Sequence, residues 1–98
     1  MIDDDDAPRE RHDYLIAFDL LEKPHEEYKY LQFALAALTA TQILDTVMMV
    51  TTDQTADELT EDLSRHLAGS DRLLVVRVFA GEGGTHNPIH TLGKLRGF

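Results

Sequence analysis

The feature that most constrains the fold is segment 14–20, Tyr-Leu-Ile-Ala-Phe-Asp-Leu, whose aromatic and branched side chains are typical of a β-strand. Successive side chains of a strand point to opposite faces, and here both faces are apolar until Asp19. We expect such a strand at the centre of a sheet, with helices over one face and a partner subunit over the other. Segment 72–80 has the same apolar character and predicts a second strand beside it.

Two segments between these strands have the periodicity of helices. Apolar residues at three- and four-residue spacing predict a helix over 25–38, with Pro24 in its first turn. A second helix is predicted after Thr55, because Thr55 and Glu58 match a capping box and Gly69 could end the helix in a left-handed conformation. The two apolar stripes are Tyr28, Leu31, Leu35 and Leu38, and Ala56, Leu59, Leu63 and Leu67.

The segment 41–52 is apolar and β-branched on both sides of a polar break at Asp45-Thr46, which predicts a pair of strands or one bent strand. The resulting order, β-α-β-β-α-β, predicts an α+β protein of the ferredoxin-like class. In that class a four-stranded antiparallel sheet has both helices on one face. We expect residues 1–13 to form a disordered acidic arm, 14–80 the domain, and 81–98 a flexible glycine-containing tail, with one added strand near 90–92 as an alternative.

Charge and composition restrict the function classes. The net charge is −9, and residues 14–80 contain eleven acidic side chains against five basic ones, so binding to nucleic acid is disfavoured. The chain has no cysteine, which excludes disulfides, thiolate zinc sites and cysteine nucleophiles. The acidic start does not resemble a signal peptide, and the apolar runs are too short to cross a membrane. We therefore expect a cytoplasmic protein.

Asp19 is the main candidate site residue, because it places an acid at the end of an otherwise apolar strand. A part-buried carboxylate must be paired, protonated or bound to a metal. One hypothesis is that two copies of Asp19 meet across a homodimer and hold Mg²⁺ or Mn²⁺ for catalysis. The simpler hypothesis is an ion pair, since the last strand of this topology neighbours the first and could bring Arg72 or Arg77 close to Asp19. The same two arginines are the candidate binding residues.

His25 follows Asp19 closely in the sequence and could act as a general acid or base, although a histidine at a helix start is more often simply exposed. His86 and His90 are separated by Pro88, which prevents the helix that would align them on one metal.

Several of these motifs together resemble the CRISPR-associated protein two superfamily, above all a set of small bacterial SinR-like members. The shared pattern is a strand that runs into aspartate-leucine, then a proline, a tyrosine and a leucine on the first helix. A leucine-aspartate-threonine follows in a later strand, and an aspartate precedes the last strand. These positions are Asp19-Leu20, Pro24, Tyr28, Leu31, Leu44-Asp45-Thr46 and Asp71.

The resemblance implies a ferredoxin-like homodimer, with Asp19 at the position of the family's metal-binding aspartate. Some members are metal-dependent nucleases and others are scaffolds. Here the segment 20–24 lacks an arginine-rich helix start, and the strand 46–49 lacks the usual aromatic residue. We therefore expect a non-catalytic dimeric module that binds another macromolecule, with a protein as one candidate partner. The alternative is a metal-dependent endonuclease acting on RNA or DNA.

Overall fold

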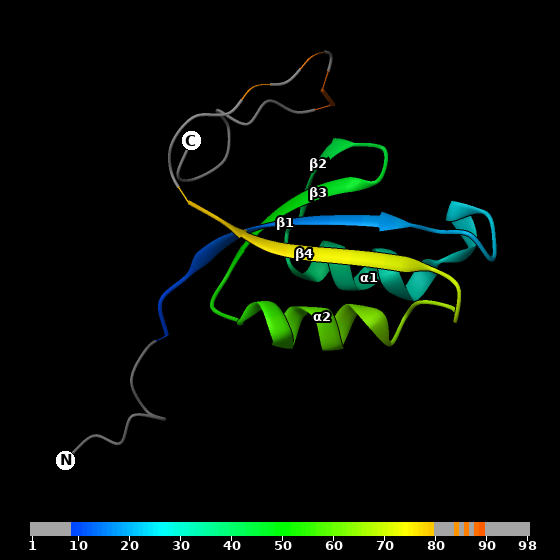
Figure 1. Cartoon of the computed structure of the whole chain (residues 1–98), viewed down its shortest axis with the longest axis horizontal. Coiled ribbons are helices and arrows are strands. Elements are labelled where there is room, and N and C mark those ends of the chain that lie inside the picture. The colour runs from blue at the N-terminus through cyan, green and yellow to red at the C-terminus, as the bar shows by residue number, and fades with distance from the viewer. Residues whose placement is uncertain (1–8, 80–83, 85, 87, 90–98) are drawn as a thin grey trace.

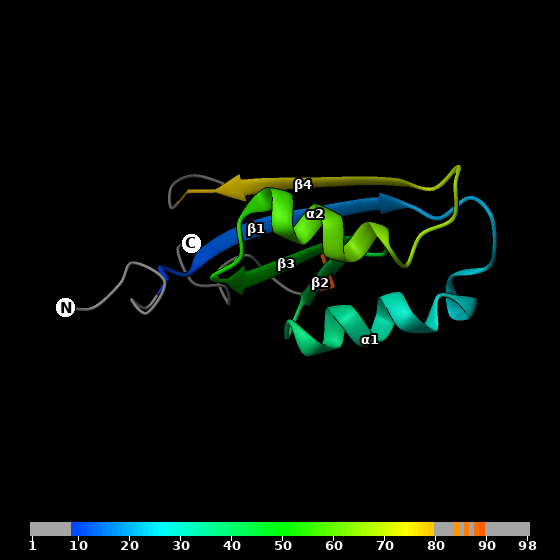
Figure 2. The same ribbon diagram turned by 90° about the horizontal axis from the view of Figure 1, so that it is seen from below.

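The computed structural model describes residues 9–79, 84, 86, 88 and 89. Four antiparallel strands form one sheet in the order β2-β3-β1-β4. Both α-helices lie on the same face of this sheet (Figures 1 and 2). This arrangement confirms the predicted α+β class and is consistent with a ferredoxin-like fold. The elements are β1 (His12–Asp19), η2 (His25–Glu27), α1 (Lys29–Ala37), β2 (Thr41–Leu44), β3 (Val47–Thr52), α2 (Ala56–Ser64) and β4 (Arg72–Val78).

The core lies between the sheet and the two helices. Tyr14, Ile16 and Phe18 project from β1 toward the helices and are almost completely buried, as their alternation along the strand predicts. From the helices, Leu31 and Leu35 of α1 and Leu59 and Leu63 of α2 complete this cluster. Burial of these apolar side chains is the main stabilising contribution to the fold.

The start of α2 is where the sequence predicts it, but the end of the helix is not. Thr55 accepts from the N–H of Glu58, and the Glu58 carboxylate accepts from the N–H of Thr55, which is the predicted capping box. Arg9 also binds Glu58 at 2.5 Å, and this hydrogen bond, with the one from Thr55, lowers the pKa of Glu58 to about 2. The helix ends at Ser64, so the prediction that Gly69 caps it is wrong.

The first helix is shorter than predicted. Residues 25–27 form a separate 3-10 turn, and α1 begins only at Lys29 because the backbone of Tyr28 is not helical (φ −87°, ψ 56°). The ring of Tyr28 is buried in the core, and its hydroxyl donates a hydrogen bond to Asp71, which lies outside the helix. The helix is therefore interrupted at the residue whose side chain makes these tertiary contacts.

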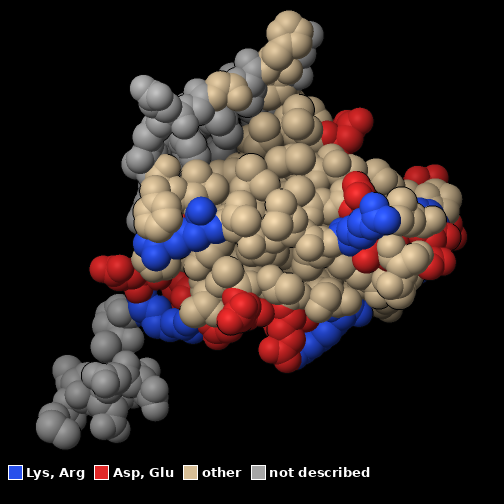
Figure 3. All heavy atoms as spheres, in the orientation of Figure 1, with Lys and Arg blue, Asp and Glu red and all other residues tan. Residues whose placement is uncertain are grey.

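The face of the sheet opposite the helices is only partly covered. Leu74 and Val76 of β4 are 54% and 40% exposed, and lie opposite Ala17 and Leu15 of β1 on this face. Figure 3 shows this face as an uncharged centre with charged side chains around its margin. We call the strip formed by Leu15, Ala17, Leu74 and Val76 the open strip.

The other half of this face, over β2 and β3, is more enclosed. Ile43 and Met49 are 4% and 2% exposed, although neither belongs to the core between sheet and helices. The N–H of Ile89 donates to the carbonyl oxygen of Ile43 at 2.7 Å, so Ile89 lies beside β2. Most of the expected arm and tail, including the alternative strand near 90–92, lies outside the described residues.

Candidate functional site

Asp19 lies at the end of β1, directly opposite Arg72 at the start of β4. The Arg72 Nη1 atom is 4.0 Å from Asp19 Oδ2, and the side chains are 78% and 59% exposed. The expected part-burial of Asp19 is therefore not found in the single chain, because no element of the described residues covers this corner of the sheet. The geometry is that of a long, exposed ion pair, which contributes little to stability.

This ion pair borders a shallow hollow of about 270 Å³ at one end of the open strip. Thr46, in the turn between β2 and β3, also lines this hollow. Leu74 belongs to both the hollow and the open strip, so the two are adjacent. We call this hollow the Asp19 hollow. The residues that line it are Ala17, Phe18, Asp19, Thr46, Arg72, Leu73 and Leu74.

Arg77 does not reach Asp19. It lies opposite Tyr14, five residues further along β4 than Arg72, and its guanidinium stacks on the Phe79 ring at 4.6 Å from the ring centroid. Of the two arginines proposed from the sequence, only Arg72 is therefore close to the aspartate.

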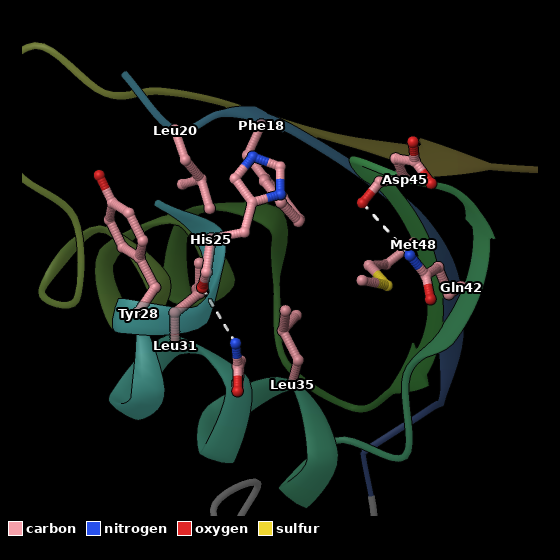
Figure 4. A pocket seen from close by; sticks show the side chains of 10 residues that line it. Phe18, Leu20, His25, Tyr28, Leu31, Leu35, Gln42, Asp45 and Met48 are labelled. Carbon is pink, nitrogen blue, oxygen red and sulfur yellow. Dashed lines mark hydrogen bonds between the residues drawn. The ribbon is translucent and has the colours of Figure 1, made fainter. Parts of the chain in front are cut away.

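His25 belongs to a different hollow, between α1 and the sheet. This space is also about 270 Å³, and Figure 4 shows His25 on one side of it, Met48 on the other and Leu35 at its floor. We call it the α1 hollow. Its lining residues are Phe18, Leu20, His25, Tyr28, Leu31, Gln32, Leu35, Gln42, Asp45 and Met48. His25 and Asp19 line different hollows, so the structure does not assemble them into one acid–base site.

Asp71 is the most connected carboxylate among the described residues. It accepts hydrogen bonds from the N–H groups of Leu21 (2.7 Å), Glu22 (3.2 Å) and Ala68 (2.7 Å), and from the hydroxyl of Tyr28 (2.9 Å). It therefore joins the loop after β1, the start of α1 and the loop after α2. The sequence marked Asp71 only as a position shared with a family; the donors that it gathers could not be found from local pattern.

The hydrogen bonds of Asp71 and Tyr28 change their acidity in opposite directions. Burial alone would raise the pKa of Asp71, but the donors from Ala68, Leu21, Tyr28 and Glu22 hold it below its ordinary value. Burial, together with the bond to Asp71, raises the pKa of Tyr28. At neutral pH the ionised carboxylate and the protonated phenol are therefore the forms that this contact favours.

Among the described residues, no three histidine or acidic side chains are grouped as a metal site within one chain would require. The two-aspartate site proposed from the sequence needs a second copy of the chain. No helix in the described part is long and apolar enough to cross a membrane. Neither the protein-family models, the curated proteins nor the solved structures gave a significant match to this chain.

Proposed function

We propose that this protein is a non-catalytic homodimeric binding module whose two copies meet through the open strip. The observation that carries this proposal is the exposure of Leu74 and Val76, which lie on the edge strand β4 and on the sheet face opposite the helices. In a monomer these side chains expose an apolar patch to water, and patches of this kind usually mark interaction surfaces.

Charge supports a second copy as the occupant of this surface. Because each copy has a net charge of −9, two copies repel one another in most of the orientations in which they can meet. The open strip has no charged member, and at its end Asp19 and Arg72 place opposite charges side by side. A two-fold arrangement can therefore bury the strip of both copies and set the aspartate of each near the arginine of the other.

The dimer is tested by sedimentation equilibrium at micromolar concentrations. We expect twice the chain mass for the wild-type protein, and a dissociation constant at least about tenfold higher for Leu74→Lys, because a lysine in the strip must lose its hydration on association. Leu21→Lys is the matched control: Leu21 is 57% exposed but lies in the loop after β1, so its replacement should leave the mass unchanged.

A monomeric wild-type protein would contradict the proposed dimer. Equal weakening by both lysine variants would also contradict it, because the effect would then follow from added charge rather than from the strip.

The second candidate function is a metal-dependent endonuclease, and the position of Asp19 beside the open strip is what favours it. A dimer with its two-fold axis at the Asp19 hollow would bring two carboxylates together, and carboxylate oxygens are ligands that Mg²⁺ and Mn²⁺ prefer. Water bound to such a cation can attack a phosphodiester.

This candidate is tested by incubating single- and double-stranded RNA and DNA with the protein and Mg²⁺ or Mn²⁺. As a non-catalytic module, the wild-type protein should leave all substrates intact. Cleavage that is lost in Asp19→Asn, while dimerisation and the activity of the control Asp57→Asn remain, would identify an endonuclease and overturn the non-catalytic assignment. Asn keeps the size of the side chain and removes the charge that a cation requires.

A further inference from the structure

The α1 hollow has the composition of a small-molecule site and is independent of the proposed dimer surface. Its apolar lining includes Phe18, Leu31, Leu35 and Met48, which come from β1, α1 and β3. At about 270 Å³ its volume is just below the usual range of about 300–1,000 Å³ for ligand pockets, so it suits a compact ligand.

The polar groups of this hollow are fixed around its rim. Gln32 Nε2 donates to the carbonyl oxygen of His25 at 3.0 Å, and Gln42 Nε2 donates to the carbonyl oxygen of Asp45 at 3.3 Å (Figure 4). These bonds hold the turn of His25 and the turn of Asp45 to the neighbouring α1 and β2. The rim therefore contains polar groups from two segments that are distant in the sequence, and the carbonyl oxygens of both segments are paired within the chain.

The charge of the lining selects the ligand. Among the residues that the structure describes, Asp45 is the only acidic one that lines the hollow, and no lysine or arginine lines it. The exposed Asp45 carboxylate points away from the hollow in Figure 4. It accepts no hydrogen bond from the described part of the chain, so a change of rotamer can turn it toward a ligand without losing one. An anion would meet this carboxylate and the negative net charge, with His25 as the one side chain of the lining that can become cationic, whereas a cation is attracted by both.

We propose that the α1 hollow binds a small aromatic amine in its ammonium form. The ring occupies the space between Leu35 and Met48, where burial of apolar surface and contact with the thioether favour it. The ammonium group lies at the rim, where the Asp45 carboxylate compensates its charge. A ligand of this class contacts both the apolar lining and the acidic rim, whereas a purely apolar molecule contacts only the apolar lining.

The test uses three probes of similar size: 2-phenylethylammonium, the neutral 2-phenylethanol and the anion 3-phenylpropionate. Binding to the full-length protein is followed by NMR of the methionine methyl groups. Met48 lines the hollow, whereas its neighbour Met49 is buried outside the core on the opposite face and serves as an internal control. We expect the ammonium probe to shift the Met48 signal and not the Met49 signal, with the alcohol weaker and the anion weakest.

Two variants separate the rim from the apolar lining. Asp45→Asn should weaken the ammonium probe about two- to fivefold, as expected for an exposed ionic contact, and leave the alcohol unchanged. The matched control Asp53→Asn changes an exposed acid that does not line the hollow, and should weaken neither probe. Met48→Phe, which fills part of the space, should weaken both probes in ligand-observed NMR, with circular dichroism used to verify its fold.

No shift of Met48 with any probe would overturn the proposal. Equal affinity for the ammonium and the anion, or an ammonium affinity that Asp45→Asn leaves unchanged, would overturn the assignment of a cationic ligand.

Discussion

Replacing Asp71 with alanine is expected to lower the melting temperature of the protein by about 5–10 °C. The carboxylate of Asp71 accepts four hydrogen bonds, three from backbone N–H groups and one from the Tyr28 hydroxyl. Alanine removes the acceptor for all of them, and the buried phenol of Tyr28 then has to find water or remain unpaired. The loop after β1 and the loop after α2 lose the contact that joins them.

The melting temperature is measured by circular dichroism, with two comparisons. Tyr28→Phe removes a single donor and should show a smaller decrease. Asp53→Ala, the same change as Asp71→Ala at an exposed acid, should leave the melting temperature almost unchanged. Equal decreases in Asp71→Ala and Asp53→Ala would show that the hydrogen bonds of Asp71 do not stabilise the fold.

The effect of Asp71→Ala should depend on pH. Because folding lowers the pKa of this carboxyl, its ionised form stabilises the folded state fully above the ordinary value of 3.8. That contribution is lost as the pH falls through the lower pKa of the folded state. The difference between the wild-type protein and the variant should therefore narrow below pH 3.8. A difference that grows on acidification would contradict the assigned direction of the pKa shift.

Replacing Leu59 with alanine is expected to lower the free energy of unfolding by about 2–5 kcal/mol. Leu59 is completely buried, at the centre of the packing between α2 and the sheet. The loss combines the transfer of the missing methyl groups with the cost of the remaining cavity. For a domain of this size that is a large share of the total stability, which is typically about 5–15 kcal/mol.

Urea denaturation of Leu74→Ala provides the matched comparison, because it removes the same atoms from a leucine that is 54% exposed in the single chain. At concentrations that keep the protein monomeric, its cost should be within about 0.5 kcal/mol of zero. In a dimer formed through the open strip, the cost of Leu74→Ala should rise with protein concentration. Equal costs for Leu59→Ala and Leu74→Ala in the monomer would contradict the division of the sheet into a core face and an open face.

The local patterns of the sequence were sufficient to predict the elements and their order. The alternation in 14–20 depends only on the geometry of an extended chain. As it predicts, Tyr14, Ile16 and Phe18 share one face of a central strand. The capping box at Thr55 and the break at Asp45-Thr46 were also predicted correctly, since a cap and a tight turn involve residues only a few positions apart.

Local patterns were insufficient at helix ends that tertiary contacts determine. The spacing of apolar residues predicted one helix over 25–38, but Tyr28 leaves the helical conformation, and its hydroxyl binds Asp71, 43 residues away. Gly69 is of the residue type that most often ends a helix, yet α2 ends five residues earlier, at Ser64. Propensities of this kind are weak, and contacts elsewhere in the fold override them.

The sequence by itself determined the fold class, the central place of β1 and the position of Asp19 at the end of that strand. Only the tertiary structure decided that Asp19 is exposed beside Arg72, that Arg77 lies apart, and that Asp71 joins two loops. It also decided that His25 and Asp45 line the same hollow. The physical reason is distance along the chain: periodicity reports the environment of neighbouring residues, whereas each of these arrangements depends on where segments about 20 to 60 residues apart return to one another.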